Sequence, residues 1–84
     1  MTDIDALLND RGAVYGDYSD VAATSQALKQ TMRQGASYGD LSAAERESLD
    51  MIANKLARAV NGKRHRDNFD DIAGYAQLAA KVSP

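Results

Sequence analysis

A run of basic-type side chains, Lys63-Arg64-His65-Arg66, is the densest positive charge in the sequence. Guanidinium groups fork onto phosphate through paired hydrogen bonds, and a histidine can donate to the same anion or titrate. Lys55 and Arg58, one helical turn apart, can extend this basic surface. The run therefore suggests an anion-binding loop. The competing interpretation is a solvated loop that the aspartates following it partly neutralise, since most surface charge runs do nothing specific.

A second polar segment, Arg11 to Asp17, contains two glycines and precedes a predicted helix start. A helix N-terminus offers free backbone N–H groups, which attract phosphate or carboxylate. The Tyr-Gly-Asp triplet of this segment occurs again at residues 38–40, also ahead of a helix start. The repeat is equally explained as turn chemistry, because glycine and aspartate both favour turns.

Carboxylates later in the chain suggest metal chemistry instead. Asp67, Asp70 and Asp71 are spaced i, i+3, i+4, so they converge on one side of a helix and suit Mg²⁺. The competing interpretation is helix capping and compensation of the helix dipole. Glu47 and Asp50 form a second acidic pair, but antiparallel packing of the two helices would separate the clusters by roughly 20 Å. The chain has no cysteine and one histidine, which excludes a Cys-ligated or His-rich metal site.

Helices must position these groups, because the single proline is Pro84 and good helix formers are abundant. Four helices are predicted, over residues 3–11, 20–34, 43–61 and 67–82. Gly12 is expected to end the first helix. Ser42 and Glu45 predict a capping box for the third, and Asp67 is expected to cap the fourth.

Each predicted helix has an apolar stripe that is expected to form the core. The expected core positions are Val21, Ser25, Leu28 and Met32, then Leu49, Ile52, Ala53, Leu56, Ala59 and Val60, then Phe69, Ile72, Ala73, Ala76, Ala79 and Ala80. Glycine inside a helix costs roughly 0.5–1 kcal/mol relative to alanine, so Gly74 suggests a close neighbour and a second contact surface on the last helix. The residues predicted for an oligomer interface there are Gly74, Tyr75, Leu78 and Val82.

The composition describes one small domain over residues 1–84, with an all-α fold of three to four helices in a bundle. Only 15 residues are Leu, Ile, Val or Phe, and a chain of this size buries only about 60% of its unfolded surface, so a homo-oligomer is expected. The net charge of −2 argues against a nucleic-acid partner. The absence of a long apolar window and of a basic leader indicates a cytoplasmic, non-membrane protein.

Three motifs carry a family resemblance: Arg11-x-x-x-Tyr-Gly-Asp, Lys55-x-x-Arg and Asp67-x-x-x-Asp-Ile-Ala-Gly-Tyr. With them the chain resembles, over nearly its whole length, a family of small phage and prophage proteins with no assigned function. Phe69 stands where members of that family often carry tryptophan. The resemblance implies a helical fold and a phage setting, and hence the cytoplasm of a host cell.

The chain is more faintly similar to the MazG-type all-α nucleotide pyrophosphohydrolases. Those helical oligomers use E-x-x-E and E-x-x-D pairs to hold Mg²⁺ over a nucleoside triphosphate. Glu47-x-x-Asp50 is present here, but E-x-x-E is absent and the acids of the last helix are all aspartate. The catalytic set that the similarity implies is therefore incomplete.

The phage resemblance suggests a different class, the small oligomers that sequester nucleotide immune signals. The leading hypothesis is a phage-type oligomer that binds a nucleotide or nucleotide-derived signal without turnover, as a sponge in counter-defence, and needs no cofactor. Tyr15 and Tyr75 would stack on a base, cationic groups would meet phosphate, and Asp17 and Asp71 would orient sugar hydroxyls or the basic side chains. The candidate ligand-binding residues are Arg11, Tyr15, Asp17, Lys55, Arg58, His65, Arg66, Asp71 and Tyr75.

Two alternatives stay open. One is a Mg-dependent, MazG-like nucleotide pyrophosphohydrolase, the one hypothesis that requires a cofactor. Its candidate metal ligands are Glu47, Asp50, Asp67, Asp70 and Asp71. The other is a protein-interaction module whose surface of Gly74, Tyr75 and Leu78 meets a host protein. The lack of a complete catalytic set favours binding over catalysis.

Overall fold

The structure is a computed structural model that describes residues 2–84. Within this range the chain forms four α-helices, a single 3₁₀ turn and no strand, which confirms the predicted all-α fold. The elements are α1 (Asp3–Tyr15), α2 (Tyr18–Arg33), η1 (Tyr38–Asp40), α3 (Ala43–Asn61) and α4 (Arg66–Val82). No helix of residues 2–84 is long and apolar enough to span a membrane.

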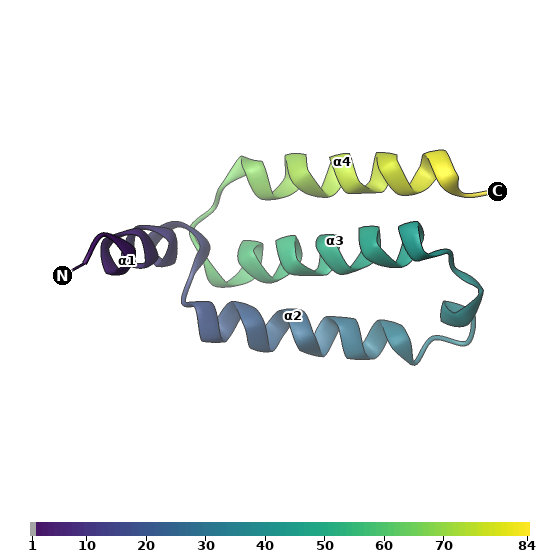
Figure 1. Cartoon of the computed structure of the whole chain (residues 1–84), viewed down its shortest axis with the longest axis horizontal. Helices are drawn as coiled ribbons and strands as arrows, with labels where there is room; N and C mark the ends of the chain where they lie inside the picture. Colours follow the sequence, from purple (N-terminus) through teal and green to yellow (C-terminus); the bar gives the residue numbers. More distant parts are fainter. Residues whose placement is uncertain (1) are drawn as a thin grey trace.

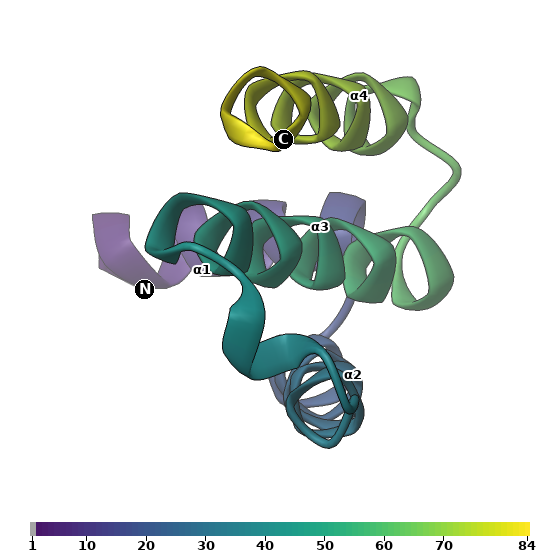
Figure 2. The ribbon, with the colours of Figure 1, turned by 90° about the vertical axis from the view of Figure 1, so that its right-hand side faces the viewer.

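The three longer helices lie in one row, with α3 between α2 and α4 (Figure 1). The view down the long axis of the molecule shows α2 and α4 on opposite sides of α3 (Figure 2). The helices therefore do not close around a shared centre. The first helix, α1, continues outward from one end of the row, and the molecule measures 49 × 23 × 22 Å (Figure 1). A row of this kind leaves two broad faces of α3 uncovered.

The core is small, as expected from a chain with few bulky residues. In the described part of the chain its buried apolar side chains are Val21, Ala53 and Ala57, and three polar residues are buried as deeply: Ser25, Ser48 and Asn68. Small side chains on α3 allow α2 and α4 to approach from both sides. Most of the large apolar side chains therefore lie outside: Ile4, Leu7, Leu8, Leu56, Val60, Phe69, Leu78 and Val82.

Two connections touch where α1 leaves the row. A Cβ on Gly16 would lie 2.6 Å from the Asn61 carbonyl oxygen, and one on Gly62 would lie 2.6 Å from the Val14 carbonyl oxygen. The backbone N–H of Lys63 donates to the same Val14 oxygen at 3.1 Å. Gly16 also has a φ of 92°, which favours glycine. Only glycine at both positions permits this backbone contact.

An asparagine at the end of α3 ties the same region to α2. The Asn61 side-chain amide donates to the Thr24 hydroxyl at 3.0 Å and to the Ala57 carbonyl at 2.8 Å. It therefore bonds across the row and also along its own helix. Together with the glycine contact, this bond fixes α1, α2 and α3 relative to one another.

The opposite end of the row is held by a carboxylate. Ser42 and Glu45 form the predicted capping box at the start of α3. The Ser83 hydroxyl, just beyond α4, donates to the Glu45 carboxylate at 2.7 Å, so the start of α3 lies beside the end of α4. The Ser83 hydrogen bond, followed by the bonds from Ser42, lowers the pKa of Glu45 below its ordinary value.

Gly12 does not end α1, contrary to the prediction. The helix continues to Tyr15, and Gly16 follows as the C-cap. Nothing lies within 4 Å of a Cβ on Gly12, so this glycine marks no close approach. A glycine inside a helix costs only about 1 kcal/mol, which neighbouring contacts can offset.

Two helix starts also differ from the prediction. Asp17 caps α2, because its carboxylate accepts from the backbone N–H of Ser19 at 2.9 Å and of Asp20 at 3.3 Å. The helix therefore begins at Tyr18, earlier than predicted. His65 caps α4 in place of Asp67, since its Nδ1 accepts the Asp67 N–H at 3.2 Å. A histidine cap is not among the preferred caps, which are Ser, Thr, Asp and Asn.

The rotation of α4 is the largest correction. Phe69, expected in the core, is 61% exposed, whereas Asn68 is 2% exposed. Ile72, Tyr75 and Ala79 are partly buried on the same stripe as Asn68. The other positions expected in the core of this helix are exposed: Ala73, Ala76 and Ala80.

An ion pair across the α3–α4 seam accompanies this rotation. Lys55 Nζ lies 3.2 Å from the Asp71 carboxylate, and the lysine side chain is only 12% exposed. The pair holds Asp71 beside α3, and Phe69, two residues away on the helix, faces outward. Leu56 and Val60 of α3, also expected in the core, are likewise exposed, at 40% and 73%. Apolar periodicity alone does not choose between two neighbouring stripes, whereas a specific pair does.

Replacing Gly62 tests the glycine contact. We expect Gly62→Ala to lower the free energy of unfolding by about 1–3 kcal/mol, because the new Cβ has no room beside the Val14 carbonyl. Gly74→Ala is the matched control and should raise it by about 0.5–1 kcal/mol, since nothing in the chain lies within 4 Å of that Cβ. Urea unfolding of both variants measures the difference. Equal stabilities for Gly62→Ala and the parent chain would contradict a tight contact.

Replacing Ser83 tests the hydrogen bond between the Ser83 hydroxyl and the Glu45 carboxylate. A depressed Glu45 pKa stabilises the fold above the ordinary glutamate pKa of about 4.3, and the effect is lost as the pH falls through the lower, folded-state value. We expect Ser83→Ala to lower the melting temperature at pH 7 and to do so less at pH 2. Ser37→Ala, at a serine that makes no cap hydrogen bond, serves as control. A loss that is identical at both pH values would assign the effect to the Ser83 bond with the Ala79 carbonyl instead.

Candidate functional site

A cleft of about 730 Å³ lies where α1 meets the row. It is lined by the second half of α1, the α1–α2 connection, the start of α2, and Asn54 and Arg58 of α3. The cleft exists because the Gly16–Gly62 contact makes α1 leave the row at this point. Its volume lies within the range of about 300–1,000 Å³ that is typical of small-molecule sites.

Two arginines converge on one tyrosine in this cleft. The guanidinium carbons of Arg11 and Arg58 lie 5.2 and 4.7 Å from the centre of the Tyr15 ring. The His65 ring lies 6.3 Å from Tyr15, centre to centre, at a tilt of 39°. Within residues 2–84, neither arginine is in ion-pair distance of a carboxylate. Two unpaired cations thus share one wall of the cleft, although the chain as a whole is acidic.

Asp17 lines the same cleft but already has a structural task. One of its carboxylate oxygens accepts both backbone hydrogen bonds that cap α2. The predicted role of Asp17 in orienting a ligand or the arginines therefore falls to its other oxygen alone. Its carboxylate lies at the N-terminus of α2, where it accepts hydrogen bonds from backbone N–H groups that a bound anion would otherwise need.

Sequence reasoning missed several side chains that line the cleft, and two of them, Asn54 and Tyr18, could contact a ligand base or sugar. Asn54 lies four residues before Arg58, so the two share one face of α3. Tyr18, at the start of α2, is 84% exposed at the rim. The helical spacing from Arg58 would have found Asn54, and Tyr18 stands in the Tyr-Gly-Asp segment that the sequence already marks.

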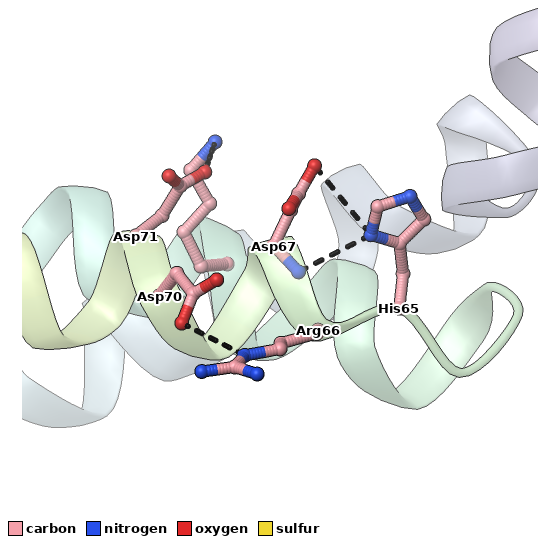
Figure 3. A network of polar contacts seen from close by, with 6 residues as sticks. His65, Arg66, Asp67, Asp70 and Asp71 are labelled. Carbon is pink, nitrogen blue, oxygen red and sulfur yellow. Dashed lines mark hydrogen bonds and ion pairs between the residues drawn. The ribbon is translucent and has the colours of Figure 1, made fainter.

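The other predicted cations have partners outside the cleft. Lys55 pairs with Asp71, as described above, and Arg66 Nε lies 3.4 Å from the Asp70 carboxylate (Figure 3). Asp70 is four residues from Arg66, so the second pair forms within a single helical turn. Arg66 of the basic run is thus paired locally with an aspartate that follows the run, as the solvated-loop interpretation of the sequence predicts, whereas Lys63 and Arg64 form no ion pair among residues 2–84.

His65 is the member of the basic run whose ring lies near Tyr15 of the cleft. Its Nδ1 accepts the Asp67 N–H at 3.2 Å and lies 3.7 Å from the Asp67 carboxylate (Figure 3). The hydrogen bond needs a neutral ring with a free Nδ1 lone pair, whereas an ion pair needs a protonated ring, so the two contacts exclude each other.

A second, shallower hollow of about 440 Å³ lies along α4, and Asp70, Asp71, Gly74, Tyr75 and Leu78 line it. It holds two predicted ligand-binding residues and three predicted for the oligomer interface. Among residues 2–84 no atom lies within 4 Å of a Cβ built on Gly74. The close neighbour that Gly74 suggested is therefore not supplied by this part of the chain, and the predicted oligomer interface stays a prediction.

The carboxylates proposed as metal ligands do not form a common cluster. In the part of the chain that the structure describes, no three His, Asp or Glu side chains come together in a way that could hold a metal ion. Asp67, Asp70 and Asp71 each lie next to a basic group instead. The bond between Glu45 and Ser83 confirms the antiparallel packing that was expected to separate the two acidic groups.

The fold and the cleft together define a small all-α protein with two unpaired arginines in a ligand-sized cleft. Residues 2–83 match the family DUF6378, described as a domain of unknown function. The chain belongs to this family. A comparison with curated proteins and another with solved structures gave no match.

Replacing Tyr15 tests how α1 is held. We expect Tyr15→Ala to raise amide hydrogen exchange in α1 about 5- to 30-fold, because two cation–π contacts worth roughly 0.5–1 kcal/mol each are lost. Exchange in α3 should stay unchanged. Tyr18→Ala removes an exposed tyrosine from the same segment and serves as control. Equal exchange in α1 for both variants would show that the arginines do not hold the helix.

Proposed function

We propose that the cleft binds a phosphate-bearing small molecule of nucleotide type and retains it intact. The observation that carries this proposal is the pair of guanidiniums, Arg11 and Arg58, that share the Tyr15 ring without a carboxylate partner among residues 2–84. Guanidinium groups bind phosphate through two parallel hydrogen bonds, and a stacked aromatic ring orients them without neutralising them. Two such groups suit a phosphate or diphosphate.

The base of the ligand is assigned to Tyr18 instead of the two tyrosines that the sequence suggested, Tyr15 and Tyr75, of which Tyr75 lines the separate hollow along α4. The guanidiniums already lie over the Tyr15 ring, so they occupy positions that a stacking base would need. Tyr18 is exposed on the same cleft and offers a free ring face. Stacking of a base on an aromatic side chain contributes about 1–3 kcal/mol. Asn54 adds an amide that can both donate to and accept from a base or sugar.

Retention without turnover is supported by the groups that surround the cleft. Among residues 2–84 the one carboxylate that lines it is Asp17, whose oxygen already caps α2, and Asp70 and Asp71 of α4 pair with cations elsewhere. Binding energy without an acid, base or metal retains a ligand but does not cleave it. A phage protein that withdraws a nucleotide signal from its host would need this property, and we propose that role for the protein.

Replacing Arg58 tests the site. We expect Arg58→Ala to weaken binding of nucleotides about 10- to 100-fold, because a charge-assisted hydrogen bond contributes about 1.5–3 kcal/mol. Isothermal titration with nucleoside mono-, di- and triphosphates and with cyclic nucleotides measures the affinity. Arg66→Ala, which removes an arginine paired outside the cleft, should leave the affinity unchanged. Arg58→Lys keeps the charge without the fork and should fall between the two.

The fate of the ligand separates binding from catalysis. After incubation, the protein is denatured and the small molecules are recovered and identified. An intact nucleotide supports retention, whereas released pyrophosphate supports the hydrolase alternative. The proposed site would be overturned if no nucleotide of the panel bound, or if Arg58→Ala and Arg66→Ala lowered the affinity equally. The contacts of Arg11 and Arg58 with Tyr15 would then serve only to stabilise α1.

A further inference from the structure

The first helix carries an apolar stripe that its own chain leaves uncovered. Ile4, Leu7 and Leu8 are spaced i, i+3, i+4 on one side of α1, and they are 69%, 57% and 59% exposed. An isolated helix of 13 residues is marginal in water, so packing on an apolar face is its usual source of stability. We call these three residues the α1 stripe.

A second apolar surface lies on one broad face of the row. Leu56 and Val60 of α3 and Phe69 of α4 are 40%, 73% and 61% exposed. At about 100° per residue, each lies roughly 100–160° around its helix from Lys55 or Asp71, whose ion pair marks the other side of the seam. The end of α3 lies beside the start of α4 (Figure 1), and the three residues belong to these two segments. We call them the Leu56 face.

We propose that two copies of this chain associate by exchange, with the α1 stripe of each copy seated on the Leu56 face of the other. Charge complementarity points to this pairing. Asp3, Asp5 and Asp10 are exposed on α1. Lys63 and Arg64 are exposed, form no ion pair among residues 2–84, and lie in the connection that leads from Val60 to Phe69 of the Leu56 face.

The alternative surface on α4 offers an acidic helix no attraction. Leu78 and Gly74 share their hollow with the carboxylates of Asp70 and Asp71, and no cation of the described residues lines it. An area argument also favours exchange. A stable interface buries about 1,200–2,000 Å², and a helix of this length is only about 20 Å long. Exchange makes the contact twice, whereas pairing of two α1 helices with each other makes it once.

The proposal is tested by the mass of the full chain in solution, without ligand. Light scattering coupled to gel filtration should give twice the chain mass of 9.0 kDa. Leu7→Glu and Phe69→Lys should each raise the dimer dissociation constant at least 100-fold and give a monomer. Both side chains are exposed in the single chain, so each variant should keep its helical circular dichroism. If Phe69→Lys loses helicity, Val60→Lys replaces it.

Mixing the two variants gives the sharpest readout. In the mixture the introduced charges attract across one contact while unaltered surfaces meet at the other, so a dimer should re-form. Leu78→Glu, on the other side of α4, is the matched control and should stay a dimer. The proposal is overturned if the parent chain is a monomer or if Leu78→Glu alone dissociates the dimer. It is also overturned if mixing Leu7→Glu with Phe69→Lys re-forms no dimer, which is the result expected if two α1 helices pair with each other or if the surfaces bind a different partner.

Discussion

The direct backbone contact between Gly16 and Gly62 is the constraint on which the rest of the structure depends. Two connections approach so closely that neither position has room for a Cβ, and a Lys63 to Val14 hydrogen bond joins them. The contact fixes where α1 leaves the row and so creates the cleft. It also brings Tyr15, at the end of α1, under the Arg58 guanidinium of α3. Two residues without side chains thus position the side chains that have chemistry to offer.

The open row of helices explains why the core is thin and the surface unusually apolar. A central helix covered on two sides needs small side chains, and Ala53 and Ala57 of α3 are buried. Larger side chains then have no interior to occupy and lie on the uncovered faces. The small core that the composition predicts is therefore a consequence of the open row of helices as well as of the low number of bulky residues. The same openness leaves surfaces such as Leu56 and Phe69 available to a second copy.

Pairing of charges, rather than their number, distinguishes the candidate site from the remaining basic surface. Cations close to an aspartate in sequence or across the α3–α4 seam, such as Arg66 and Lys55, are neutralised. Arg11 and Arg58 are drawn together from separate helices onto a neutral aromatic ring, and that ring orients them without cancelling their charge. This arrangement is the basis for proposing that the cleft binds anions although the chain has a net charge of −2.

Features encoded locally could be predicted from the sequence: helical content, the Ser42–Glu45 capping box, and a marked segment from Arg11 to Asp17 that does line the cleft. These depend on neighbours within one or two turns, where residue type largely decides the outcome. Tertiary structure alone decided the rotation of α4, the convergence of Arg58 on Tyr15 and the exclusion of Lys55 from the cleft. Helical periodicity presented two adjacent apolar stripes on α4, and only the packing of distant segments, with an ion pair between α3 and α4 and a glycine contact, selected between such alternatives.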